Sequence, residues 1–209
     1  FYLLIYGTTI AAMTFAFYLS LERIPLGVSV ALQFLGPLGV AVGGSRRPLD
    51  LFWVALAVAG IIMIIPNMLV IGRNSHDALG IFYALLAAGF WATYIIFGRR
   101  VSERLPAGRG SALGLLVASA LVVPVGLWHR HENLMNETLW LYAPVVAVLA
   151  CALPYTLELL AMGRLPTKIF GVLMSLEPAI AALFGHYLLD EVLYPEQWCG
   201  IAAIIAASA

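Results

Sequence analysis

Long apolar runs separated by short polar breaks dominate the chain. The apolar positions are continuous and do not alternate with a period of two, so they predict helices and not strands. Most runs have about 20 residues, the length that a helix needs to cross the hydrocarbon core of a bilayer. The pattern predicts an all-α integral membrane protein with eight helices in this chain, at 2–21, 26–44, 51–71, 78–98, 111–128, 139–163, 169–188 and 197–209.

Basic residues are distributed unevenly among the polar breaks. Eight of the eleven Lys and Arg residues lie in the second, fourth and sixth breaks, at 45–50, 99–110 and 164–168. Loops on the cytoplasmic side of a membrane carry an excess of Lys and Arg. We therefore expect these three breaks, and with them both ends of the chain, to lie on the cytoplasmic side.

Two parts of the sequence match at a constant offset of 141 residues. Residues 23–25 read Arg-Ile-Pro and correspond to Arg-Leu-Pro at 164–166, and Pro37 corresponds to Pro178 in the same way. Each matched pair has the same spacing, and each is followed by a polar break and a further helix. The match predicts an internal duplication.

The duplication predicts a protein longer than this chain. Residues 1–77 supply the last three helices of a first repeat, whose first two helices are missing, and residues 78–209 supply a second repeat of five helices with a truncated last one. The intact protein then has ten helices, and the odd number in each half inverts the second repeat relative to the first. Inverted five-helix repeats are an architecture of secondary transporters, whose substrate site lies near the bilayer midplane.

Composition agrees with a membrane location. Of the 209 residues, 63% are hydrophobic and 11% are charged, whereas soluble domains have about a quarter charged residues. The formal net charge is zero and no basic tract occurs, which argues against a nucleic-acid partner. Cys151 and Cys199 lie in apolar runs, and we interpret them as small buried hydrophobic residues and not as a disulfide or metal pair.

Catalytic and cofactor motifs are absent from the sequence. It has no nucleotide-binding glycine loop, no Ser/His/Asp set and no zincin motif, which argues against an ATP-driven pump. His129 and His131 are two residues apart in a hydrophilic break, so we expect neither a metal site nor a cofactor. Two alternatives to transport stay open: a lipid-modifying membrane enzyme that uses an intramembrane carboxylate as general base, and a non-transporting scaffold.

Two carboxyl groups lie within predicted spans, at Glu158 and Glu177. An ionisable group there costs about 2.5–3.5 kcal/mol on insertion scales, so each is a candidate functional group. Glu177, which we expect in the middle of its helix, is the first candidate to bind a proton or a substrate ammonium, and Glu158 is the second. The alternative roles are a protonated packing group for Glu177 and a side chain that snorkels to the interface for Glu158.

Four further side chains are candidates to line a substrate cavity. Gln33 lies one turn before Pro37 and can bond either an amino acid or a neighbouring helix. Trp91 and Tyr94 lie in the helix predicted at 78–98, and Trp91 is near its middle, away from the interfacial belts where Trp collects. Ordinary packing is the alternative for both. Tyr155 follows a proline in its helix.

Several segments resemble a known family. Residues 17–38, 152–158, 164–167 and 173–179 are similar to the EamA branch of the drug/metabolite transporter superfamily, in particular to its inner-membrane threonine/homoserine exporters. Leu-Pro-Tyr and Glu-Pro-Ala, within the second and fourth of these segments, are the more specific parts. Exporters of this kind can carry an acidic residue in the helix where this chain has Gln33.

The resemblance implies a multi-pass protein of the bacterial inner membrane with ten helices and cytoplasmic termini. It also implies export of threonine-like amino acids or related metabolites by alternating access, driven by the proton gradient. The expected partners are therefore a small-molecule substrate and the lipid bilayer.

Overall fold

The computed structural model describes residues 1–43, 55, 56, 59, 60, 63, 75–130, 137–165, 170, 173, 174 and 176–208. All regular elements in these ranges are helices, which confirms the all-α class. Four segments are long and apolar enough to cross a membrane: Tyr2–Leu21, Ala78–Ser102, Ala107–Trp128 and Trp140–Arg164. The helix predicted at 51–71 falls almost entirely outside the described residues.

The chain folds into two compact units, each built from segments that are far apart in sequence. Unit 1 comprises Phe1–Ala12 and Thr93–Pro166, and unit 2 comprises Met13–Ala92 and Thr167–Ala209. Helices α1 (Tyr2–Leu21) and α5 (Ser75–Ser102) supply residues to both units. Each unit therefore draws on residues from both predicted repeats.

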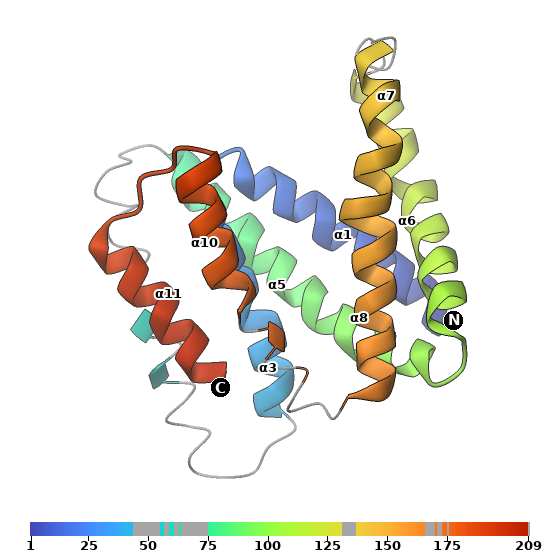
Figure 1. Ribbon diagram of the computed structural model, residues 1–209, viewed down its shortest axis with the longest axis horizontal. Helices are drawn as coiled ribbons and strands as arrows, with labels where there is room; N and C mark the ends of the chain where they lie inside the picture. Colours follow the sequence, from blue (N-terminus) through green and yellow to red (C-terminus); the bar gives the residue numbers. More distant parts are fainter. Residues whose placement is uncertain are drawn as a thin grey trace. The chain divides into compact units, whose positions relative to one another are not determined.

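Unit 1 is built on two long antiparallel helical segments. The first is α6 (Ala107–Arg130), and the second is a continuous rod made of α7 (Glu137–Val146), a π-helix η2 (Ala147–Ala152) and α8 (Leu153–Arg164). Figure 1 shows this rod running alongside α6. The rod matches the helix predicted at 139–163, but its middle is wound more loosely than an α-helix.

The π-helical turn in the rod has a local cause in the sequence. Pro154 has no backbone N–H, so it cannot bond the carbonyl of Ala150 four residues earlier. Further along the same stretch, the hydroxyl of Thr156 donates to the carbonyl of Ala152 at 2.6 Å. Single π-turns of this kind are often found next to functional groups.

The first turns of α1 pack closely against α6 because both helices have glycine at the contact. A Cβ atom at Gly7 would lie 2.5 Å from Val117 Cβ and 2.6 Å from the carbonyl oxygen of Gly114. Small residues allow helix backbones to approach in this way in membrane proteins. The crossing brings the residue before Gly7, Tyr6, into the interior of unit 1.

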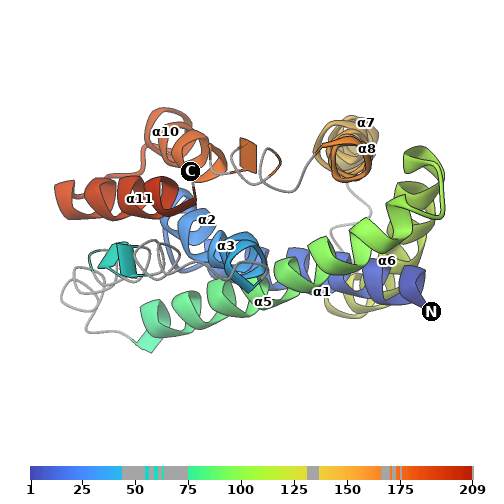
Figure 2. The same cartoon turned by 90° about the horizontal axis from the view of Figure 1, so that it is seen from below.

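Unit 2 packs α2 (Leu26–Gln33) against α10 (Glu177–Leu188). A Cβ at Gly27 would lie 2.6 Å from Ala182 Cα, so this contact also depends on a glycine. Helix α11 (Pro195–Ser208) lies beside α10, as Figure 2 shows.

The helix predicted at 26–44 is interrupted. The structure has α2 up to Gln33 and then α3 (Leu35–Gly43), with Phe34 between them. The physical reason is Pro37, which has no N–H to bond the carbonyl of Gln33. The apolar helix nevertheless extends over Leu26–Val40, so the interruption is a local irregularity at Phe34 within the predicted helix.

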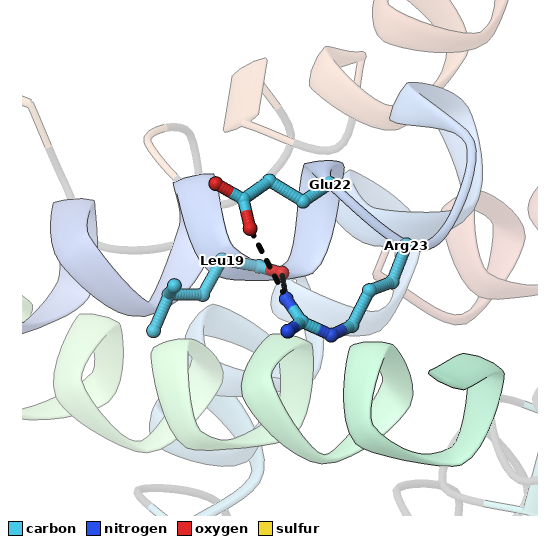
Figure 3. A network of polar contacts seen from close by, with 3 residues as sticks. All are labelled: Leu19, Glu22 and Arg23. Carbon is cyan, nitrogen blue, oxygen red and sulfur yellow. Dashed lines mark hydrogen bonds and ion pairs between the residues drawn. The ribbon is translucent and has the colours of Figure 1, made fainter. Parts of the chain in front are cut away.

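The turn between α1 and α2 is held by Arg23. Its guanidinium donates to the carbonyl oxygen of Leu19 at 2.8 Å and pairs with the exposed carboxylate of Glu22 at 3.4 Å (Figure 3). The same guanidinium lies over the ring of Tyr83, 5.3 Å from its centroid. Arg23 thus ties the end of α1 to α5 within unit 2.

The start of α2 receives its cap from a distant residue. The N-cap position is Pro25, which offers no side-chain hydrogen bond. Instead, both carboxylate oxygens of Glu191 accept from the N–H of Leu26, each at 2.9 Å. Asp190, with φ of 53°, turns the chain after α10 so that Glu191 can reach this position.

The two cysteines are unpaired, but the prediction that both are buried was wrong. Cys199 is exposed and Cys151 is half-buried. In a membrane protein, an apolar side chain need not be covered by protein, because lipid tails are as apolar as the protein interior.

Replacing Glu191 with alanine tests the cap on α2. We expect a loss of about 1 kcal/mol, because the N–H of Leu26 loses its acceptor. For a chain of this length that corresponds to a fall of about 2–4 °C in the apparent melting temperature. The measurement is thermal unfolding in detergent.

The matched control is Glu22→Ala, which removes an exposed surface ion pair that contributes little to stability. Its melting temperature should equal that of the wild type. If the two variants shifted equally, the bond from Leu26 to Glu191 would not be a stabilising cap.

Candidate functional site

A carboxyl group inside a membrane span forms the centre of the candidate site. Glu158 lies on α8 in unit 1 and is half-buried. It accepts a hydrogen bond of 2.9 Å from the hydroxyl of Tyr94 on α5. The side chain of Tyr94 is fully buried. The structure thus brings together two of the residues that the sequence nominated.

Two more tyrosines surround this pair. The ring of Tyr155 meets that of Tyr94 edge to face, with centroids 5.8 Å apart. On α1, the ring of Tyr6 stacks on Tyr94 with centroids 5.1 Å apart and an interplanar angle of 23°. Three helices that are distant in sequence therefore contribute tyrosines to one cluster around Glu158, which we call the tyrosine cluster (Tyr6, Tyr94 and Tyr155).

Tyr6 was not among the residues predicted from the sequence. Its side chain is fully buried, and its hydroxyl has no hydrogen-bond partner among the described residues. No signal in the sequence singled it out, because it lies near one end of the span Tyr2–Leu21, where tyrosines are common in membrane helices.

Glycines on two helices make room for the ring of Tyr6. A Cβ at Gly98 on α5 would lie 3.2 Å from one ring carbon and 3.1 Å from the sulfur of Met162. A Cβ at Gly114 on α6 would overlap the other edge of the ring. The ring therefore occupies a slot that any larger residue at Gly114 would close.

A second polar contact joins α6 to α8 in unit 1. Ser111, which is buried, shares a hydrogen bond of 2.7 Å with the hydroxyl of Thr156. Thr156 lies between Tyr155 and Glu158 in the sequence, so α8 carries three polar side chains within four consecutive residues.

Unit 2 holds the other three predicted residues. Gln33, the last residue of α2, is 6% exposed, and its amide nitrogen has no partner among the residues described. Trp91 is 4% exposed and packs edge to face against Phe34, with centroids 6.3 Å apart. Gln33 and Trp91 are thus buried in the part of unit 2 where α2 ends.

Glu177 differs from its predicted setting. It is the first residue of α10 and is exposed, whereas the sequence placed it in the middle of a helix. Pro178, directly after it, stands at the start of a helix, where a missing N–H leaves no bond unmade. The other predicted carboxyl group, Glu158, lies inside the cluster of polar side chains described above.

The chemistry of this cluster follows from its groups. A carboxyl group can take up a proton or pair with a cation such as an ammonium group, and a phenol can donate or accept a hydrogen bond. Ionisable groups within membrane helices mark pathways for substrates or protons. The fold and the site therefore define a class, the multi-pass helical membrane transporters.

Comparison with known proteins identifies the family within this class. The model of the EamA-like transporter family matches residues 78–209. The threonine/homoserine exporter RhtA of Escherichia coli strain K12 is 46% identical over 209 residues, which cover 99% of this chain and 69% of that protein. The same exporter of Salmonella typhimurium strain SL1344 is 45% identical over the same shares. The chain belongs to the EamA-like transporter family.

More distant proteins match the chain in sequence or in fold. The uncharacterized transporter YwfM of Bacillus subtilis strain 168 is 24% identical over 170 residues, 77% of this chain and 54% of that protein. A crystal structure of a protein with 18% identity matches with a TM-score of 0.68 over 98% of this chain and 74% of the other. Family membership confirms the prediction of a transporter, as opposed to the lipid-modifying enzyme or the scaffold.

Gly114→Ala tests the slot that holds Tyr6. The added methyl group would collide with the ring, and overpacking of this kind costs about 1–3 kcal/mol. We expect a lower melting temperature in detergent. Gly126→Ala is the matched control, because Gly126 lies in the same helix and no atom of the described residues is within 4 Å of its Cβ position.

At Gly126, alanine should leave the melting temperature unchanged or raise it, since alanine favours a helix over glycine by about 1 kcal/mol. Equal shifts of the same sign in the two variants would show that the ring of Tyr6 does not fill the space beside Gly114.

Proposed function

We propose that this protein exports threonine, homoserine or related small amino acids across the bacterial inner membrane by alternating access. The observation that carries the proposal is the intramembrane carboxyl of Glu158, which is hydrogen-bonded to Tyr94 in a family of transporters. Similarity to threonine/homoserine exporters at 46% identity over 99% of the chain supports the class of substrate.

The proposed architecture is a pair of inverted five-helix repeats with ten helices in all. Residues 1–77 belong to the first repeat and residues 78–209 to the second, and both ends of the chain face the cytoplasm. The offset of 141 residues and the distribution of Lys and Arg support this arrangement. The interruption between α2 and α3 supports it as well, because broken helices form the substrate sites of such transporters.

Within unit 1, Glu158 is the proposed site for the substrate ammonium or for the coupling proton. An ammonium group is a strong donor that a carboxylate in an apolar environment binds well. The bond from Tyr94 orients the carboxyl group, and the ring of Tyr155 forms part of the wall beside it. Coupling to the proton gradient follows if the same carboxyl group binds a proton when the amino acid has left.

Unit 2 contributes the remaining proposed residues. The buried amide nitrogen of Gln33 has no partner among the described residues, and Trp91 packs against the adjacent Phe34. Glu177 stands at the first turn of α10, next to Pro178, and is exposed. These three residues are proposed to meet the substrate or the proton at another step of the cycle.

Glu158→Gln tests the proposal directly. The amide keeps the shape of the side chain and can still accept from Tyr94, but it cannot bind an ammonium ion as a charge pair or carry a transported proton. We expect the initial rate of threonine counterflow, measured in proteoliposomes that contain the full chain, to fall at least about tenfold, equivalent to about 1.4 kcal/mol.

Glu103→Gln is the control, because this carboxylate is exposed and its contact with Arg99 is only a 4.0 Å pair. It should transport at the wild-type rate. Unchanged, proton-dependent counterflow by Glu158→Gln would remove Glu158 from the mechanism. Glu177→Gln, tested in parallel, shows whether the second carboxyl group takes part.

A further inference from the structure

We propose that Tyr6 is a specificity-determining residue whose hydroxyl donates a hydrogen bond to the carboxylate of the amino-acid substrate. The inference rests on the proposed function, in which Glu158 pairs with the substrate ammonium. It adds a second contact that neither the family resemblance nor the sequence pattern assigned.

The first argument is the unused hydroxyl of Tyr6. The side chain is fully buried, and its oxygen lacks a partner among the described residues. Leaving a buried polar group unpaired destabilises a protein, whereas a phenylalanine would fill the same slot without that loss. A ligand that accepts a hydrogen bond from the Tyr6 hydroxyl during the transport cycle would explain why a tyrosine stands at this position.

The second argument is the position of this hydroxyl relative to Glu158. The ring of Tyr6 stacks on Tyr94, and Tyr94 is the residue that donates to Glu158. The Tyr6 hydroxyl interacts with Tyr94 and, through its charge distribution, with Glu158, but it makes no contact with either that meets the distance and angle limits of a hydrogen bond. The unused donor and the intramembrane carboxylate therefore belong to one cluster within unit 1.

The third argument comes from the chemistry of an α-amino acid. Its ammonium and carboxylate groups are attached to the same carbon, so a site that pairs the ammonium with Glu158 must hold the carboxylate nearby. A carboxylate in an apolar environment needs hydrogen-bond donors. Tyr94 already donates to Glu158, whereas Tyr6 has a hydroxyl that is still available.

The residues around the ring of Tyr6 determine the position of its hydroxyl group. Gly98 and Gly114 lie against opposite edges of the ring on two helices, so the ring is enclosed on both sides. A rigidly held phenol loses little conformational freedom when it binds a ligand, which favours its use as a specific contact.

The test compares two ligands and two variants. L-threonine has the carboxylate, whereas 1-amino-2-propanol keeps the ammonium and the hydroxyl group but lacks the carboxylate. Each compound competes with labelled L-threonine in counterflow assays on proteoliposomes of the full chain. The variants are Tyr6→Phe and, as a control on the same helix, Tyr18→Phe, whose side chain is 59% exposed.

We expect Tyr6→Phe to raise the half-inhibitory concentration of L-threonine about tenfold or more, since a hydrogen bond to a charged group is lost. The half-inhibitory concentration of 1-amino-2-propanol should stay within about twofold of the wild-type value, because this compound has no carboxylate to accept a hydrogen bond from Tyr6. Tyr18→Phe should change neither value. If Tyr6 acted only through packing, the substitution would raise the half-inhibitory concentrations of both compounds equally.

Three results would overturn the inference. Equal losses for both ligands would show that Tyr6 acts through packing, and no loss for either would show that its hydroxyl bonds only Tyr94 or a buried water. Both results leave the proposed function intact as long as the wild type exchanges threonine. Absence of threonine counterflow by the wild type would overturn the proposed function and this inference with it.

Discussion

The hydrogen bond from Tyr94 to Glu158 is the interaction on which the rest of unit 1 depends. A carboxyl group in an apolar span is costly unless it has polar partners, and this bond connects α5 to α8 at the centre of the cluster. Tyr6 and Tyr155 then pack against Tyr94 from two sides. Glu158 thus both joins α5 to α8 and serves as the candidate binding group. A substrate that binds Glu158 would therefore also change the packing between these helices.

Glycine and proline make this arrangement possible. Gly98 and Gly114 leave room for a large ring between helices, and small residues allow the close approach on which membrane helix packing relies. Pro154 loosens the rod into the π-turn Ala147–Ala152, which ends shortly before Tyr155. Proline has a similar effect in unit 2, where Pro37 interrupts the helix after Gln33. Backbone irregularities therefore occur in each unit next to the polar side chains proposed for transport.

The sequence predicted four spans that the structure confirms, because continuous apolar runs of membrane length have few alternatives to a helix. It also nominated Glu158 and Tyr94, since charged and polar side chains are conspicuous in such runs. It did not predict Tyr6, because packing between α1 and α5 depends on contacts that no local pattern contains. The central position assigned to Glu177 and the burial of Cys199 were wrong for related reasons. The start of α10 at Glu177 and the exposure of Cys199 both depend on how neighbouring helices pack.

Protection of a cysteine placed in the cluster tests the central claim, that an amino acid binds beside Glu158. The measurement is the rate at which a membrane-permeable maleimide alkylates Tyr155→Cys in the full chain, with Cys151 and Cys199 replaced by serine. This variant must still transport threonine, and a counterflow assay checks that it does. L-threonine at about ten times its dissociation constant should slow the reaction about tenfold, because only the free fraction reacts. Equal rates with and without threonine would contradict the account.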